Sequence, residues 1–128
     1  MKPNDSNEPS SSPTNTSDAS DTPDAKAIYK EGFALFVKGE VDAAIDRYRD
    51  ALEVDAELSI AWNGLSIALA KKGDLEAAVE AAEKLIEVEP DDPLSHTNLS
   101  RILMQQGLIP EAEDAKAKAM GLQMKQGS

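Results

Sequence analysis

Apolar residues recur at helical spacing from Ala25 onward, and the pattern returns every 34 residues. Three glycines, Gly39, Gly73 and Gly107, stand at this interval and interrupt the pattern at the same point each time. Cut at this period, the chain gives three segments that align without a gap: 25–58, 59–92 and 93–126. A period of this length predicts one helix-turn-helix unit per segment, and such units stack into an array.

Each unit is predicted to contain two helices joined by a tight turn. The first helices are expected at about Ala25–Lys38, Ser59–Lys72 and Pro93–Gln106, and the second helices at about Val41–Val54, Leu75–Val88 and Pro110–Leu122. The turn glycine follows the first helix, where a left-handed backbone costs glycine little. Acidic residues such as Asp42, Asp74 and Glu111 then open the second helix, where they complement its positive end. The fold class is therefore all-α, and the glycine interruptions exclude one long coiled coil.

Residues 1–24 have a different composition. They contain four prolines, a run of three serines and no Ile, Leu, Val or aromatic residue, and one lysine faces five carboxylates. A segment of this kind cannot bury enough apolar surface to offset the entropy of ordering. We predict a disordered acidic tail over 1–24 and a single domain over 25–128.

Composition limits the classes of partner. The 128-residue chain is 41% hydrophobic, which suits one domain with a modest core. Its formal net charge of −11 repels phosphate backbones and anionic lipids, so we expect neither a nucleic acid nor a membrane as partner. Residues 1–12 lack the apolar run of a secretory signal, and no stretch approaches the ~20 apolar residues that span a bilayer. With no cysteine in the chain, these features predict a soluble cytoplasmic protein.

The aligned columns resemble the tetratricopeptide repeat, whose signature is W-x2-L-G-x2-Y, then A-x3-F, then P. The middle unit matches best, with these residues in signature positions: Trp62, Leu65, Ser66, Leu69, Ala78 and Pro90. The first unit departs at Glu31 and Ala56, and the third has His96 in the tryptophan position and Lys116 in the aromatic position. The resemblance implies a short right-handed α-solenoid of three units that binds other proteins.

The second helix of the third unit is more polar than its equivalents. Glu113 and Lys116 occupy columns that hold Ile45 and Tyr48 in the first unit. If these columns pack against a following unit, charges there predict that no fourth unit follows. The apolar residues Met120, Leu122 and Met124 leave open an alternative, a weak homodimer through this rim.

Catalytic and metal-binding patterns are not found in the sequence. The chain has one histidine, no cysteine and no glycine-rich phosphate loop. His96 shares a column with Ile28 and Trp62, which predicts a packed or semi-exposed helix residue rather than a ligand or a base. The acidic group Glu89, Asp91 and Asp92 lies between two prolines and lacks the ligand spacing of a calcium loop, which predicts a turn. We expect no enzyme activity, no cofactor and no metal site.

The resemblance implies that the first helices line a concave groove that binds a peptide. The predicted contact residues are Lys26, Tyr29, Lys30, Phe33, Phe36, Ile60, Asn63, Ile67, Lys71, Leu94, Asn98, Arg101 and Met104. None is acidic, although 24 of the 128 residues are Asp or Glu. Apolar, amide and basic side chains suit an extended or helical peptide that carries a carboxylate, with Asn63 and Asn98 available to hold its backbone.

Some members of this family bind acidic chaperone tails through a clamp of lysine, asparagine and arginine residues. Only one of its five positions is matched here, since they correspond to Tyr29, Phe33, Asn63, Leu94 and Asn98. The predicted function is therefore a non-catalytic adaptor that binds a peptide segment of a partner protein. Three alternatives stay open: a self-associating structural subunit, a docking subunit for a partner enzyme, and a co-chaperone without a complete clamp.

Overall fold

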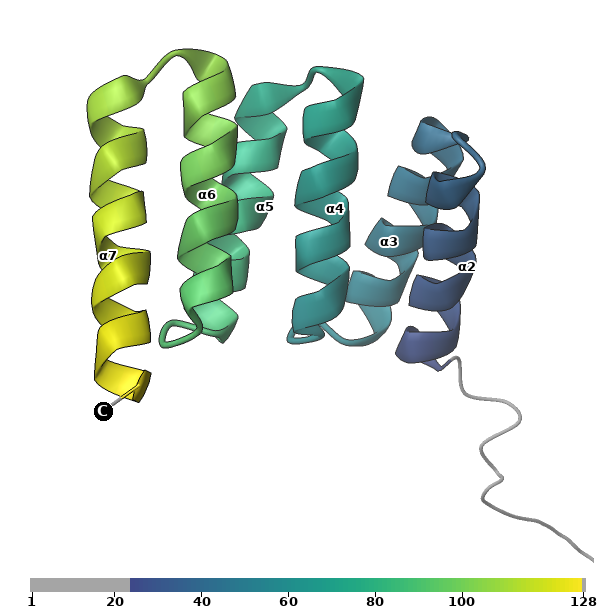
Figure 1. Cartoon of the computed structure of the whole chain (residues 1–128). Helices are drawn as coiled ribbons and strands as arrows, with labels where there is room; N and C mark the ends of the chain where they lie inside the picture. The colour runs from purple at the N-terminus through teal and green to yellow at the C-terminus, as the bar shows by residue number, and fades with distance from the viewer. Residues whose placement is uncertain (1–23, 128) are drawn as a thin grey trace, which may run out of the picture.

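A computed structural model of the chain describes residues 24–127, which form six helices and no strand. The helices are α2 (Ala25–Val37), α3 (Val41–Val54), α4 (Ser59–Lys72), α5 (Leu75–Val88), α6 (Pro93–Gln106) and α7 (Ile109–Gly127) (Figure 1). The predicted all-α class is confirmed, and five of the six predicted ranges match within one residue. The exception is α7, which continues past the predicted end at Leu122. The tail predicted over 1–24 lies outside the described residues except for Asp24.

The three turn glycines share one conformation. Gly39, Gly73 and Gly107 have φ angles of 88°, 97° and 82°, in the left-handed region where a side chain is strained. The residue after each glycine donates its backbone N–H to a leucine carbonyl at 2.9–3.0 Å; the pairs are Glu40 with Leu35, Asp74 with Leu69, and Leu108 with Leu103. These bonds satisfy carbonyls at the end of the first helix, which confirms the predicted stop.

Aspartates cap several helix starts. A side-chain oxygen of Asp24 accepts a hydrogen bond from the Lys26 N–H, and Asp92 accepts one from Leu94. Asp74 caps α5 in the same way, at 3.3 Å from the Ala77 nitrogen. Glu40, which precedes α3, makes no side-chain cap bond. Asp24, predicted as part of the tail, therefore serves as the N-cap of α2.

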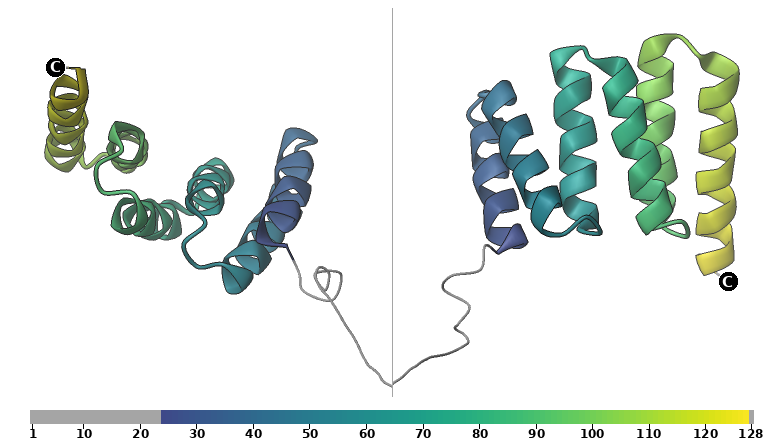
Figure 2. Two further views of the ribbon diagram at one scale, coloured as in Figure 1. Left: turned by 90° about the horizontal axis from the view of Figure 1, so that it is seen from below. Right: turned by 180° about the vertical axis from the view of Figure 1, so that it is seen from behind.

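The helices form a curved double layer in which each helix packs against the next (Figure 2). Helices α2, α4 and α6 lie on the hollow side of the curve, and α3 and α5 lie on the outer side. The layers approach closely because alanines meet between them, with Ala44, Ala78 and Ala112 at 0% exposure. The predicted stacking of units is therefore present, and it turns the first helices of all three units toward the hollow side.

The core has a larger and a smaller part. The larger part joins buried residues of α3, α4 and α5, including Tyr48, Leu65 and Ala82. The smaller part holds Leu103, Ala112 and Ala115 between α6 and α7. On α7 the predicted polar residues Glu113 and Lys116 are exposed. Among the described helices, none has the length and apolar character that crossing a membrane requires.

Candidate functional site

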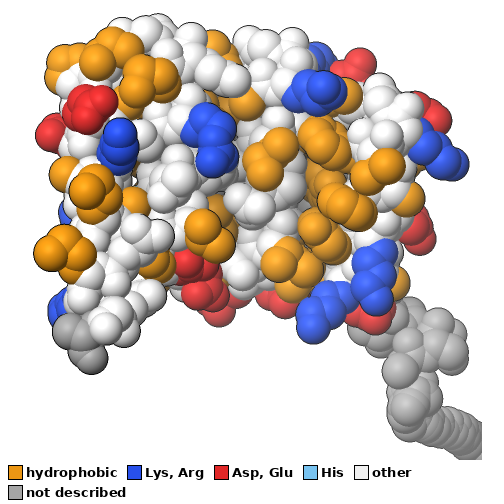
Figure 3. Space-filling view, in the orientation of Figure 1, with side chains coloured by type: hydrophobic (Ala, Val, Ile, Leu, Met, Phe, Trp, Pro, Cys, Tyr) orange, Lys and Arg blue, Asp and Glu red, His pale blue; other side chains and the backbone are white. Residues whose placement is uncertain are grey.

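The hollow side carries a row of exposed apolar side chains. Phe33 is 52% exposed, Ile67 38% and Leu94 70%, and each comes from a different inner helix. Figure 3 shows this face, with hydrophobic side chains spread over α2, α4 and α6 and acidic side chains toward its margins. Exposed apolar side chains that gather on one face, unlike scattered ones, often mark an interaction site, so the hollow side is the main candidate for a binding surface.

The predicted contact residues all come from α2, α4 and α6, and they differ in how far they are exposed. Nine are exposed: Lys26, Lys30, Phe33, Ile60, Ile67, Lys71, Leu94, Arg101 and Met104. Tyr29, Phe36 and Asn63 are half-buried. Asn98 is buried.

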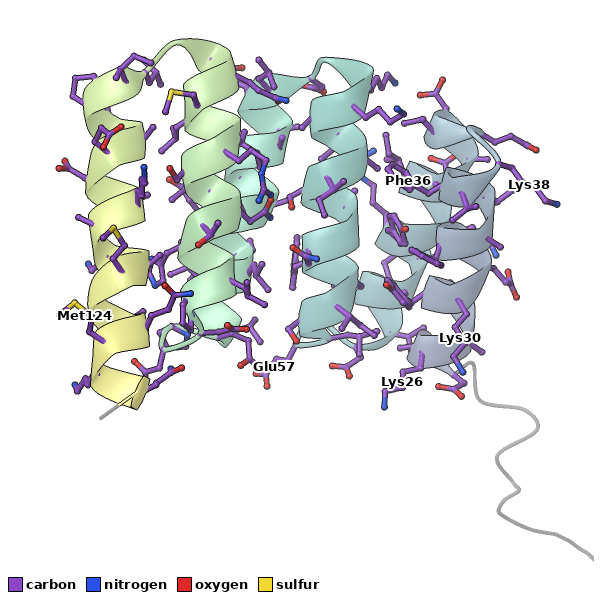
Figure 4. All side chains as sticks on the ribbon, in the orientation of Figure 1. Lys26, Lys30, Phe36, Lys38, Glu57 and Met124 are labelled. Carbon is purple, nitrogen blue, oxygen red and sulfur yellow. The ribbon has the colours of Figure 1, made fainter. Side chains whose placement is uncertain are left out.

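Aromatic residues of α2 form one side of the groove. The rings of Tyr29 and Phe33, one helical turn apart, stack with centroids 6.3 Å apart. The ring of Tyr29 also stacks on the buried Tyr48 of α3 at 5.5 Å. Phe36 continues this side toward α4 (Figure 4). We call Tyr29, Phe33 and Phe36 the aromatic ledge, and its base is held by the core.

Tyr48 fills the junction between the first and second units. A Cβ atom at Gly32 would lie 2.8 Å from the Tyr48 ring, and one at Gly64 would lie 2.9 Å from its Cζ. The ring therefore occupies space that side chains at both glycines would need. Burial raises the pKa of Tyr48 to about 12, and the neighbouring Tyr29 adds to the shift. No hydrogen bond joins the Tyr48 hydroxyl to another residue of 24–127.

Hydrogen bonds fill the corresponding junction between the second and third units. Here Ala82 takes the column of Tyr48. The side-chain nitrogen of Asn98 donates to Ser66 Oγ at 2.6 Å, and that hydroxyl donates to the Asn63 carbonyl at 2.8 Å. The sequence prediction left the Asn98 side chain available for a peptide backbone. The structure corrects this, because its amide nitrogen is buried and bonded within the protein.

Two hollows flank α6 on the inner face. The first has a volume of about 380 Å³ and lies between α4 and α6, with an apolar lining that includes Phe36, Ile67 and Ile102. The second has a volume of about 500 Å³, lies between α6 and α7, and includes Met104 and Lys116. Arg101 and Gln105 border both hollows. The sequence did not predict either hollow, since each depends on how far neighbouring helices diverge.

Four cations of the inner helices make no ion pair with any residue of 24–127: Lys26, Lys30, Lys71 and Arg101. By contrast, Lys72 lies 2.7 Å from Asp42, and this hydrogen bond raises the pKa of Lys72. Lys26 and Lys30 lie together at one end of α2, whereas Lys38 points away at the outer edge (Figure 4).

Charge along the groove is uneven. Lys71 and Arg101 both border the hollow between α4 and α6. Nearer the N-terminal ends of the same helices, Ile60 and Leu94 share a smaller hollow of about 190 Å³ with Glu89 and Asp92. These carboxylates belong to the turn before α6, so a prediction limited to the first helices missed them. The groove is thus basic at one end of α4 and α6 and acidic at the other.

His96 has a packing role that explains its place in the tryptophan column. The ring nitrogen Nε2 of His96 lies 2.9 Å from the Pro90 carbonyl, and Trp62 Nε1 donates to the Ala56 carbonyl at 2.7 Å. Both rings reach back six residues to the turn between units. His96 is 6% exposed, which confirms the predicted packed helix residue. Within 24–127, no group of His, Asp or Glu side chains converges to hold a metal ion.

Comparison with known proteins supports the repeat assignment. The sequence profile of the tetratricopeptide repeat matches residues 29–87 and 67–122. A search of curated proteins gave no significant match. Among solved structures, MamA aligns with a TM-score of 0.79 at 28% identity, covering 83% of this chain and 62% of the MamA chain. This chain therefore spans about three fifths of the length of MamA.

A second similar structure contains a bound peptide. It is the Yersinia enterocolitica type III secretion chaperone SycD in complex with a peptide of the translocator YopD. The alignment has a TM-score of 0.72 at 20% identity and covers 76% of this chain and 74% of SycD. At that identity the likeness concerns the fold. Together with the matched profile, the three aligned units and the repeated turn, it shows that the chain belongs to the tetratricopeptide repeat family.

Proposed function

We propose that this protein is a non-catalytic adaptor that binds a peptide segment of a partner protein in the groove formed by α2, α4 and α6. The observation that carries the proposal is the composition of the inner face of the array. The inner helices expose Phe33, Ile67 and Met104 and place no carboxylate in their predicted contact columns. This combination favours a partner that brings apolar side chains and negative charge.

Apolar contacts supply most of the expected affinity. Full burial of a large apolar side chain contributes about 1.5–3 kcal/mol, and Phe33, which is 52% exposed, has roughly half of that still to gain. Exposed ion pairs add only about 0.2–1 kcal/mol each. After the costs of ordering a peptide, we expect reversible binding with a dissociation constant of about 1 μM.

The similar structures give this proposal a precedent. SycD has been solved with a peptide of the translocator YopD, and its fold aligns with 76% of the present chain. That precedent is peptide binding by a protein of this fold, and the partner of the present chain is a separate question. We propose no nucleic acid or membrane as partner, and a cytoplasmic location remains a prediction from the sequence.

A capture experiment tests the proposal. Tagged protein is compared with the variants Phe33→Ala, Lys30→Glu and Arg101→Glu, and captured proteins are identified by mass spectrometry. We expect each variant to lose a shared set of partners while keeping its helical circular dichroism. Val54→Ala is the matched control, because Val54 is 43% exposed on α3, outside the inner helices. Capture that persists in all three groove variants would rule out the groove.

Self-association is the second candidate, and exposed methionines favour it. Met120 and Met124 of α7 are 53% and 73% exposed, and Met124 lies on the far edge of the array from α2 (Figure 4). Sedimentation over a wide concentration range distinguishes the candidates. A mass that rises with concentration and falls back in Met120→Ser/Met124→Ser would support an assembly subunit. A mass that stays at the monomer value at all concentrations would exclude self-association.

The co-chaperone alternative is weakened by the burial of Asn98. This residue occupies one of the five clamp positions, and its amide nitrogen is bonded to Ser66. The other positions hold Tyr29, Phe33, Asn63 and Leu94, of which Asn63 alone matches the clamp. We therefore do not propose an acidic chaperone tail as the partner.

A further inference from the structure

We propose that the groove selects a segment within a partner chain in which two apolar side chains, about three residues apart, flank one or more carboxylates. The apolar side chains would enter the two hollows beside α6, and the carboxylates would face Lys71 and Arg101. This inference rests on the proposed function and specifies the chemistry of its partner.

Two cations without an internal partner lie beside the hollow between α4 and α6. Lys71 and Arg101 border the same hollow of about 380 Å³, whose other lining residues are apolar or amide. Neither forms an ion pair within residues 24–127, although those residues include 20 of the chain's 24 carboxylates. Lys72, Arg47 and Lys84 all have carboxylate partners. A partner carboxylate could therefore reach Lys71 and Arg101 without displacing an internal one.

The two hollows define the apolar positions. Phe36, Ile67 and Ile102 give the hollow between α4 and α6 an apolar wall. The hollow between α6 and α7 offers one apolar side chain, Met104, and its other lining residues are polar or charged, with the cation Lys116 among them. A hollow of about 380 Å³ is near the lower end of the usual range for ligand sites, about 300–1,000 Å³, and is open on one side, which suits a side chain. Arg101 borders both hollows and therefore lies between the two apolar positions.

Helix size sets the spacing. A segment that crosses α6 from one hollow to the other spans about one helix diameter, roughly 10 Å. An extended chain advances about 3.3–3.6 Å per residue, so three residues cover this distance. Apolar residues at i and i+3, with an acidic residue at i+1 or i+2, would match the two hollows and Arg101 between them. Lys71 borders the first hollow from α4, so it would face a carboxylate next to the apolar residue that enters this hollow.

Acidic residues at the N-terminal ends of α4 and α6 limit where the carboxylates can go. Glu89 and Asp92 border the hollow that holds Ile60 and Leu94, and they would repel a carboxylate placed there. Lys71 and Arg101 lie in the C-terminal halves of the same helices. Along α4 and α6 the charge therefore favours a carboxylate near Lys71 and Arg101, whereas Lys26 and Lys30 offer a separate basic position on α2.

A peptide selection tests the inference without a known partner. Libraries of random 12-residue peptides are displayed on phage, one library with the peptide inside a longer chain and one with a free C-terminus. Full-length protein is the bait, and captured peptides are sequenced. The bait is compared with Phe33→Ala, with the double variant Lys71→Gln/Arg101→Gln and with the charge-matched control of that double variant, Lys72→Gln/Lys84→Gln.

We expect the internal library to yield peptides with two apolar residues three apart and Asp or Glu between them. The acidic preference should vanish with the groove variant and persist with the control. In fluorescence anisotropy, loss of each cation should weaken a selected peptide about two- to fivefold. Raising the salt concentration from about 0.1 M to about 1 M, which shortens the Debye length from about 10 Å to about 3 Å, should erase the difference.

Other outcomes overturn the inference in distinguishable ways. Apolar peptides without an acidic preference, still sensitive to Phe33→Ala, would overturn the charge inference and leave the groove intact. Enrichment only in the library with a free C-terminus would overturn the inference that the bound segment lies within the partner chain. A selection indifferent to every groove variant, or no enrichment over a blank surface, would overturn both the inference and the proposed function. Selected peptides whose sequences resemble α7 would instead identify a second copy of this chain as the occupant of the groove.

Discussion

The two junctions between units solve the same packing problem with different chemistry. At the first junction the Tyr48 ring fills the space beside Gly32 and Gly64. At the second, Ala82 replaces the tyrosine, and Ser66 and Asn98 fill the space with a hydrogen-bonded pair. The first junction supports an aromatic ledge, and beside the second lies the hollow bordered by Lys71 and Arg101. Different residues at equivalent positions of the repeats thus give the groove an aromatic side and a basic hollow.

The largest expected effect is the loss of the aromatic ring at the first junction. Tyr48 is 1% exposed, so Tyr48→Ala should lower the free energy of unfolding by about 3–5 kcal/mol, as for other buried aromatic residues. Urea denaturation followed by circular dichroism measures the change. Phe33→Ala serves as the control, because Phe33 is half exposed and should cost much less. A loss below about 1 kcal/mol at Tyr48 would contradict its role as the filling of this junction.

Glycine substitutions sharpen the same test. Gly32→Ala should destabilise the native protein, because its Cβ would lie 2.8 Å from the Tyr48 ring. In the Tyr48→Ala background the contact with the ring is gone, and a close contact with Arg47 Cβ at 3.1 Å remains. The better helix propensity of alanine, worth up to about 1 kcal/mol, should then offset most of the cost of Gly32→Ala. An equal loss of stability in both backgrounds would show that the cost at Gly32 does not come from the ring.

The next effect is a dependence of stability on high pH. Burial raises the pKa of Tyr48 to about 12 from its ordinary value of 10, so the unfolded chain releases this proton at lower pH than the folded chain. The contribution of Tyr48 to stability should therefore be constant below about pH 10 and fall by about 2 kcal/mol as the pH approaches 12. Urea denaturation at several pH values measures the slope, and Tyr48→Phe should remove the Tyr48 share of it. An unchanged slope in Tyr48→Phe would assign the dependence to other groups.

The smallest expected effect is the coupling between Ser66 and Asn98 at the second junction. Ser66→Ala and Asn98→Ala should each lower the free energy of unfolding by about 1–3 kcal/mol, because each breaks a hydrogen bond among buried groups. A double-mutant cycle should give a coupling of about 0.5–1.5 kcal/mol between them. Zero coupling would mean that the Asn98 amide does not depend on Ser66, and would restore Asn98 as a candidate for peptide contact.

Local sequence signals predicted the helices and turns well. The spacing of Gly39, Gly73 and Gly107 fixed the repeat because a left-handed turn at each unit needs glycine. The continuation of α7 to Gly127 was missed. Gly121, next to the predicted end at Leu122, remains helical, and no proline follows Pro110, so neither residue type stops the helix at Leu122. Helix ends without such a signal depend on packing and on side-chain contacts, such as the bond from Gln126 to the Asp91 carbonyl.

The candidate site was predictable only in part. Column positions placed the contact residues on the inner helices, because side chains at equivalent positions of stacked helices share a face. They did not reveal that Asn98 turns into the junction toward Ser66, or that Glu89 and Asp92 border the groove from a turn. The first fact depends on a contact between residues 32 positions apart, and the second depends on the geometry of a turn. A repeat alignment contains neither.

Site-specific photo-crosslinking tests the central claim, that the hollow side binds another protein, most directly. The photo-reactive amino acid p-benzoylphenylalanine is placed at Phe33 in the groove, at Val54 on α3 and at Met124 on α7, all of which are exposed. The account predicts adducts with a different protein from position 33, and no such adducts from positions 54 and 124. Adducts from position 54 or 124 without any from position 33 would contradict it.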